Sequence, residues 1–197
     1  MKEKLHIIPH NHQVDAQDRA RLNGHQGKTI WFVGLSGSGK STLASELERR
    51  LHEQGKRTYI LDGDNIRAGL NADLDFSDAA RKENIRRISE VAKLMVDAGV
   101  IVLTAFITPF EEEREKVKAL IGADNYIEVF VNCPLEECEK RDVKGLYAKA
   151  RRGEISNFTG ISSPFEEPKN PHIKIPTHQM SVEEGVNKLM AYLEQEI

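Results

Sequence analysis

The residues of this 197-residue chain that are best suited to chemistry form one short run, Gly34-Leu35-Ser36-Gly37-Ser38-Gly39-Lys40-Ser41. The run matches every fixed position of the phosphate-binding pattern G-x-x-x-x-G-K-[S/T]. Its glycines let successive backbone N–H groups turn toward phosphate oxygens, and a following helix would direct its positive end at the same anion. Lys40 is expected to reach the β- and γ-phosphates, and the Ser41 hydroxyl, beside Thr42, to lie on Mg²⁺. The run therefore predicts binding of a nucleoside triphosphate.

The segments on either side of this run predict a strand before it and a helix after it. Apolar residues fill 30–33, and Leu43, Leu47 and Leu51 follow at helical spacing. Further strands are expected at 57–61, 100–105, 126–131 and 172–175, and further helices near 78–98, after Pro109, after Pro134 and after a capping box at Ser181 and Glu184. This alternation predicts an α/β P-loop NTPase fold, with a parallel five-stranded sheet flanked by helices.

The length predicts a single domain with an N-terminal arm. Residues 1–28 are polar and are expected to form the arm, and residues 29–197 to form a P-loop kinase domain. Residues 144–171 contain several glycines and prolines and show no clean periodicity. An irregular stretch of this length within a compact domain is usually functional or mobile, so we expect one of these roles for it.

The composition limits the kinds of binding partner and the cellular location that we expect. The net charge of −3 gives no reason to expect a nucleic acid. No apolar run approaches the roughly 18 residues that span a membrane, and the N-terminus does not have the pattern of a signal peptide. The two cysteines, Cys133 and Cys138, are too few for a disulfide framework. A cytoplasmic location is therefore expected.

Two carboxylates, Asp62 and Asp64, directly follow the strand predicted at 57–61. Ligands of open parallel sheets bind beyond the carboxyl ends of the strands. Phosphoryl transfer to an alcohol needs a carboxylate that orients the hydroxyl or accepts its proton. The chain also lacks an Asn-Lys-x-Asp guanine motif, and the strand at 100–105 ends without a magnesium-binding Asp. A small-molecule kinase is favoured, although a simple turn with a helix cap at Asp64 would fit the same residues.

Cationic and aromatic side chains downstream indicate the acceptor. Arg67 lies one turn after Asp64, and Arg81, Asn84 and Arg87 recur at intervals of three. Guanidinium groups bind phosphate or sulfate through two hydrogen bonds, although a solvated helix face would look the same. Three phenylalanines in irregular segments could stack on a base or anchor their loops to the core: Phe76, Phe158 and Phe165. For Phe158 the anchoring role is favoured.

Taken together, these motifs resemble adenylylsulfate (APS) kinase of the bacterial, single-domain type. The resemblance extends from about residue 25 to residue 175. It rests on WFVGLSGSGKST (31–42), DGDNIRAGL (62–70), FSDAARKENIRRISEVAKL (76–94), LTAFITPF (103–110) and KGLYAKARRGEISNFTGISSPFEEP (144–168).

The resemblance implies transfer of the γ-phosphoryl group of ATP, with Mg²⁺, to the ribose 3′-hydroxyl of adenylyl sulfate. The product would be 3′-phosphoadenylyl sulfate, in sulfate assimilation. It also implies a homodimer and a mobile lid at approximately 144–171. An ATP sulfurylase could bind the chain non-covalently. Two alternatives remain at this point: a P-loop kinase of another small hydroxyl acceptor, such as a nucleoside, shikimate or gluconate, and a nucleotide-binding regulatory protein.

The resemblance also assigns roles to individual residues. Asp64 is the expected base, Asp62 shares the metal with Ser41, and Lys144 neutralises charge during transfer. Arg141 is expected to border the adenine of ATP. The acceptor would be held by Arg67, Arg81 and Asn84, its adenine sandwiched by Phe76 and Phe165, and its pocket lined by Ile107 and Leu146.

Thr108 stands where the family usually has a serine, which in bacterial members is sometimes described as a phosphorylated intermediate. A threonine could still accept a phosphoryl group, so Thr108 is a possible phospho-acceptor. Direct in-line transfer explains the other residues equally well and is preferred.

Overall fold

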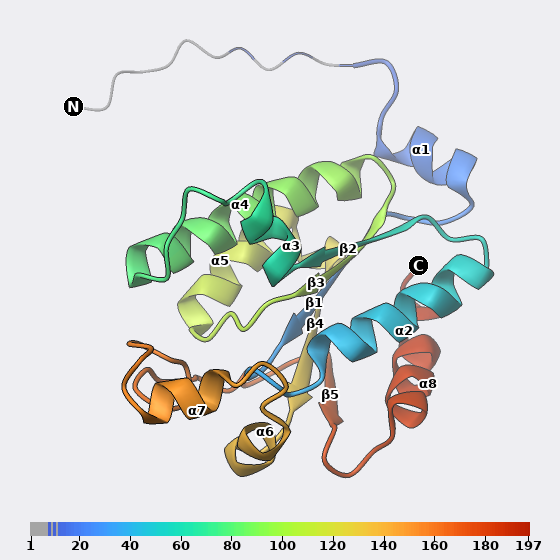
Figure 1. The fold of residues 1–197 in the computed structure, drawn as a ribbon. Coiled ribbons are helices and arrows are strands. Elements are labelled where there is room, and N and C mark those ends of the chain that lie inside the picture. Colours follow the sequence, from blue (N-terminus) through green and yellow to red (C-terminus); the bar gives the residue numbers. More distant parts are fainter. Residues whose placement is uncertain (1–7, 9, 11) are drawn as a thin grey trace.

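A five-stranded parallel sheet lies at the centre of the structure (Figure 1), a computed structural model that describes residues 8, 10 and 12–197. The strands lie in the order β2-β3-β1-β4-β5. Their bounds are Thr29–Val33 (β1), Thr58–Asp62 (β2), Ile101–Ala105 (β3), Tyr126–Asn132 (β4) and Ile173–Pro176 (β5). The predicted parallel sheet is confirmed. Part of the predicted arm, residues 1–7, 9 and 11, lies outside the described residues.

The central strand, β1, is buried along its whole length. It pairs in parallel with β3 through Ile30 and Leu103 and with β4 through Ile30 and Ile127. Alternate side chains point to opposite faces of a strand, so Ile30 and Phe32 enter one core and Trp31 and Val33 the other. This burial explains why β1 reads as a continuous apolar run.

Two helices cover each face of the sheet, as Figure 1 shows. α2 (Lys40–Glu53) and α8 (Val182–Leu193) pack on one face, and α4 (Asp78–Asp97) and α5 (Glu111–Ile121) on the other. Leu43, Leu47 and Leu51 are buried on α2 as their spacing predicts. The predicted capping box of Ser181 and Glu184 begins α8.

Short helices gather near the carboxyl ends of the strands. α3 (Gly63–Ala68) follows β2, α6 (Leu135–Arg141) follows β4, and α7 (Leu146–Arg151) comes next. A 3-10 turn at Ala123–Asn125 joins α5 to β4. A third cluster of buried side chains packs beneath α6 and α7, and it contains Leu35, Cys133, Cys138, Tyr147, Ala150 and Phe158. Phe158 therefore anchors its loop, as the sequence favoured.

The predicted arm contains a helix that the sequence analysis missed, α1 (Ala16–Asn23). Asp15 and Asp18 form a capping box at its start. The helix is tied to the end of α4, where Arg19 pairs with Asp97 at 2.9 Å and Asn23 Nδ2 donates to the Gly99 carbonyl at 3.1 Å. None of its residues is buried, so no apolar periodicity marks it in the sequence.

The expected irregular stretch 144–171 also contains regular structure, because Leu146–Arg151 form α7. The Asp142 carboxylate accepts hydrogen bonds from the backbone N–H groups of Tyr147 and Ala148, each at 3.0 Å. A six-residue helix capped from outside by an aspartate is too short to show a helical period. The remainder of the stretch has only one isolated bridge, between Thr159 and Ser163.

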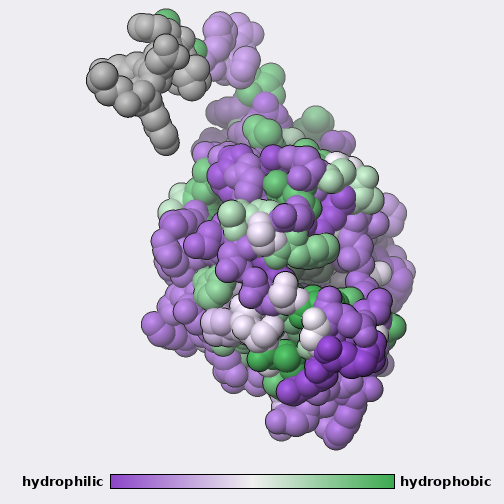
Figure 2. Space-filling view, turned by 60° about the vertical axis from the view of Figure 1, so that its left-hand side comes forward, coloured by the Kyte–Doolittle hydropathy of each residue, from purple (hydrophilic) through white to green (hydrophobic). Residues whose placement is uncertain are grey.

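The face of the molecule in Figure 2 is mainly hydrophilic, with hydrophobic residues in smaller separate areas. Within the part of the chain that the structure describes, no helix is both long enough and apolar enough to cross a membrane. Cys133 and Cys138 are buried free thiols.

Candidate active site

The glycine-rich run forms a tight turn between β1 and α2. Gly37 and Gly39 have φ values of 73° and 103°, a region that residues with a Cβ rarely adopt. A Cβ on Gly37 would also lie 3.1 Å from the Cys138 carbonyl oxygen. Gly39 then serves as the N-cap of α2 without a side-chain cap, so the first N–H groups of the helix stay available to an anion.

Two residues that the sequence analysis missed hold the carbonyl groups of this turn. The Tyr147 hydroxyl donates to the Ser36 carbonyl at 2.9 Å, and the Thr177 hydroxyl donates to the Ser38 carbonyl at 2.7 Å. Arg141 donates to the Thr177 carbonyl at 2.8 Å and, at 3.3 Å, to the Ser38 carbonyl. The Ser38 N–H donates to the Leu35 carbonyl at 3.2 Å within the turn. With the Ser36 and Ser38 carbonyls engaged, other N–H groups of the turn can face phosphate.

Lys40 lies over the turn from the first position of α2. Its ammonium group donates to the Gly34 carbonyl at 2.9 Å and to the Leu35 carbonyl at 2.7 Å. The residue is only 8 % exposed, and this burial lowers the pKa of Lys40 to about 8. A phosphate ligand would supply the negative charge that this buried cation lacks.

A line of polar contacts continues from the phosphate turn to the end of β2. Ser41 Oγ donates to Asp62 Oδ2 at 3.0 Å, and Asp62 Oδ1 accepts from the Asp64 N–H at 3.0 Å. Asp62, rather than Asp64, is therefore the N-cap of α3. Asp64 itself forms an ion pair with Lys144. One residue, Gly145, separates Lys144 from the start of α7. The structure thus brings four predicted site residues together.

The predicted cation cluster is present only in part. The pKa of Arg67 is lowered, first by burial and then by the positive charge of the nearby Arg81. The Arg67 guanidinium lies 4.4 Å from the centre of the Phe76 ring, and Phe76 is 66 % exposed. Two neighbouring guanidinium groups beside an exposed aromatic ring suit a ligand with an anion and a base.

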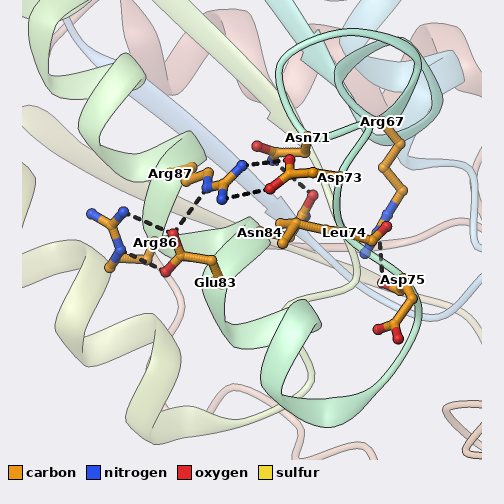
Figure 3. Close-up of polar contacts among 9 residues, drawn as sticks. All are labelled: Arg67, Asn71, Asp73, Leu74, Asp75, Glu83, Asn84, Arg86 and Arg87. Carbon is orange, nitrogen blue, oxygen red and sulfur yellow. Dashed lines mark hydrogen bonds and ion pairs between the residues drawn. The ribbon is translucent and has the colours of Figure 1, made fainter.

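Arg87 is held by two acidic side chains, one on the segment between α3 and α4 and one on α4 itself (Figure 3). It pairs with Asp73 at 2.7 Å and with Glu83 at 2.9 Å, which fixes the segment between α3 and α4. Spacing groups Arg87 with Arg81 and Asn84, but its guanidinium is engaged by Asp73 and Glu83, so an anion-binding role for Arg87 stays a prediction. A pattern of spacing cannot show which partner an arginine takes.

Asn84 is buried at the base of the same segment. Its side-chain oxygen accepts a hydrogen bond from Asn71 Nδ2 at 2.9 Å (Figure 3). Asn71 is completely buried and was not singled out from the sequence, because a lone asparagine carries no pattern. The pair links α4 to the segment that carries Arg67 and Phe76.

The loop after β3 is fixed from below. Thr108 has a φ of 42° and is 1 % exposed. Its hydroxyl accepts a hydrogen bond from Trp31 Nε1 at 3.0 Å, and its carbonyl accepts one from Arg114 at 3.0 Å. The Thr108 hydroxyl therefore faces the core, which argues against the predicted phospho-acceptor role. Ile107, one residue earlier, is partly buried on this loop.

The other predicted residues lie on the stretch after α6. Leu146 begins α7 and packs, partly buried, on the third cluster of apolar side chains. The Phe165 ring stacks on Phe130 with 6.2 Å between ring centres and is also partly buried. Thr42 is exposed on the first turn of α2.

Comparison with known proteins gives a consistent result. The family model for adenylylsulphate kinase matches residues 26–176. An adenylyl-sulfate kinase of Staphylococcus epidermidis is 54% identical over 195 residues, covering 99% of this chain and 98% of its own length. A probable adenylyl-sulfate kinase of Halalkalibacterium halodurans is 59% identical over 188 residues, covering 95% and 93%.

Among solved structures, the Mycobacterium tuberculosis APS kinase CysC in complex with AMPPNP and APS has a TM-score of 0.82 and 51% identity, covering 86% of this chain and 98% of that one. A gluconokinase from Sinorhizobium meliloti has a TM-score of 0.59 at 17% identity, covering 85% of this chain and 92% of that one. The second likeness shows the fold alone.

The lowered pKa of Lys40 predicts a pH dependence of ATP binding. Below pH 8 the ammonium group is charged and attracts the triphosphate; above pH 8 it loses its proton, so the Kd for Mg·ATP should rise as pH increases from 7 to 9.5. Calorimetry across this range measures the Kd. Lys40→Arg stays charged and should give a flatter profile. A wild-type Kd that does not change with pH would contradict the prediction.

Proposed function

This chain belongs to the adenylylsulphate kinase family, and from that premise we propose how its own residues carry out the transfer. The chain is an ATP-dependent kinase that phosphorylates the ribose 3′-hydroxyl of adenylyl sulfate. The products are ADP and 3′-phosphoadenylyl sulfate, in sulfate assimilation. The observation that best supports the residue roles is the line of contacts from Ser41 through Asp62 and Asp64 to Lys144.

The ATP end of the site is assigned to the turn before α2. The backbone N–H groups of 34–42 and the ammonium group of Lys40 would bind the phosphates. Arg141 would border the adenine, because it already lies against Ser38 and Thr177 at the edge of the turn. Tyr147 and Thr177 keep the carbonyl groups of the turn engaged.

Ser41 and Asp62 offer a hydroxyl and a carboxylate oxygen 3.0 Å apart, which suits Mg²⁺. In the described residues no three His, Cys, Asp or Glu side chains gather as a metal site, so further ligands would come from ATP and water. When bound, the ion would neutralise charge on the transferred phosphoryl group.

Asp64 is assigned to the acceptor hydroxyl. Its side chain is 73% exposed and follows the end of β2, where an acceptor can approach the phosphates. The carboxylate would orient the 3′-hydroxyl and accept its proton. Lys144 pairs with Asp64, and from this place it would reach the transferred phosphoryl group as negative charge develops there.

The acceptor is assigned to residues of α3, of α4 and of the segment between them, with further contacts from the loop after β3 and from the stretch 144–171. Arg67 and Arg81 would hold the phosphosulfate group, with Asn84 on the ribose. Phe76 and Phe165 would sandwich the adenine, and Ile107 and Leu146 would line the pocket. The exposed ring of Phe76 and its contact with the Arg67 guanidinium support this assignment.

The stretch 144–171 is proposed as the lid, since it carries Lys144, Leu146 and Phe165. We also propose a homodimer; a related APS kinase from Thiobacillus denitrificans, 31% identical, is described as hexameric. We further propose that the chain associates with an ATP sulfurylase, since the reaction of a sulfurylase supplies adenylyl sulfate. A cytoplasmic location is proposed because both cysteines are free thiols.

Replacing Asp64 by Asn tests the assignment of the base. The variant keeps the size of the side chain but cannot accept the proton, so kcat should fall by about 10²- to 10⁴-fold. The Kd for Mg·ATP should change by no more than about twofold, because Asp64 is not assigned to ATP. Steady-state kinetics and calorimetry measure both, with Asp124→Asn as a distant control. A fully active D64N variant would rule out this role.

Replacing Thr108 by Val separates direct transfer from a covalent route. Valine has the same shape but no hydroxyl, so Trp31 Nε1 loses its partner and the free energy of unfolding should fall by about 1–3 kcal/mol. The kcat should stay within about threefold of wild type if the phosphoryl group passes directly to the acceptor. Chemical denaturation and turnover measure the two effects. A folded T108V protein without turnover would support a phosphorylated Thr108 instead.

A further inference from the structure

The start of α5 is capped by a residue that is distant in sequence. The N-cap, Phe110, provides no side-chain hydrogen bond. Instead Glu166 Oε2 accepts from the Glu111 N–H at 2.8 Å, and the Glu166 N–H donates to the Pro109 carbonyl at 2.8 Å. This reciprocal pair of hydrogen bonds resembles a capping box formed between two segments of the chain. It attaches the stretch after α7 to the loop that follows β3.

The point of attachment is itself fixed. The loop is held through Thr108 by Trp31 and Arg114, and both of these side chains are at least 98% buried. Arg114 also belongs to α5, so the loop and the first turns of the helix form one unit. Glu166 is thus attached to the partly buried start of a helix whose preceding loop is anchored in the core.

Phe165 immediately precedes this docked residue. Its ring stacks on Phe130 of β4 with an interplanar angle of 30°. Lys169, three residues beyond Glu166, pairs with Glu111 at 2.9 Å and holds the same segment from its other side. The ring position therefore depends on the stack with Phe130 and on the backbone position that Glu166 sets.

We propose that Glu166 is a positioning residue of the acceptor site, which sets the place of Phe165 without touching the acceptor. This inference rests on the assignment of Phe165 to the acceptor adenine. Because the Phe165 ring is then already held in place, less conformational entropy is lost when the acceptor binds. Loss of the Glu166 cap should therefore weaken acceptor binding and leave ATP binding unchanged.

The chemistry of the cap makes a specific variant informative. α5 already has Glu111, Glu112 and Glu113 in its first turn, so a further negative charge adds little there. What Glu166 contributes is a hydrogen-bond acceptor at the right place. Glu166→Gln retains such an oxygen and should behave like wild type, whereas Glu166→Ala should not.

The test compares E166A, E166Q, F165A and E167A in steady-state kinetics. Glu167 is an adjacent, exposed residue of the same type, so E167A is the matched control. We expect E166A and F165A each to raise the KM for adenylyl sulfate on the order of tenfold, the effect of about one ordinary hydrogen bond. The KM for ATP should stay within about twofold in all four, as should the KM for adenylyl sulfate in E166Q and E167A.

The outcomes separate the inference from the site assignment. An effect of F165A without an effect of E166A would overturn the role of Glu166 and retain Phe165 as an acceptor contact. A normal KM in F165A would overturn the assignment of Phe165, and the inference with it. An E166Q variant as impaired as E166A, or an E167A variant as impaired as both, would also contradict the proposed hydrogen bond. Hydrogen exchange at 163–167 without substrates should increase in E166A alone.

Discussion

The position of β1 between two parallel neighbours is the constraint on which the site depends. Strand β1 is covered on both faces and pairs in parallel with β3 on one side and β4 on the other. Because β1 and β4 are parallel, their carboxyl ends lie at the same end of the sheet. The phosphate turn begins at this end of the sheet, and the parallel pairing of β2 with β3 places Asp62 at the same end. Ligand groups from separate parts of the sequence thus meet without any long connection.

Sequence alone could predict the parts of the fold that repeat a local pattern. Apolar runs marked the five strands, and the spacing of Leu43, Leu47 and Leu51 marked α2. The helix α1 was missed because it has no buried residue, and α7 because six residues are too few to show a period. Local patterns report burial: α1 is stabilised by its caps and surface contacts, whereas α7 buries Tyr147 and Ala150 but is too short for these two to show a period.

The same distinction applies to the candidate site. Lys40, Ser41, Asp62 and Asp64 could be predicted because the chemistry dictates their types and spacing. Tyr147, Thr177 and Glu166 could not, since their side chains bond to backbone groups that are far away in the sequence. The pairing of Arg87 with Asp73 likewise depends on the path of the chain between α3 and α4.

The central claim is that the phosphoryl group passes directly from ATP to adenylyl sulfate at the carboxyl ends of the strands, without a phosphorylated residue as an intermediate. The steric course at phosphorus tests it most directly. ATP made chiral at the γ-phosphorus with oxygen isotopes would be turned over, and the configuration of the 3′-phosphoryl group of the product determined. A single in-line transfer predicts inversion. Retention would require two transfers and would contradict the account.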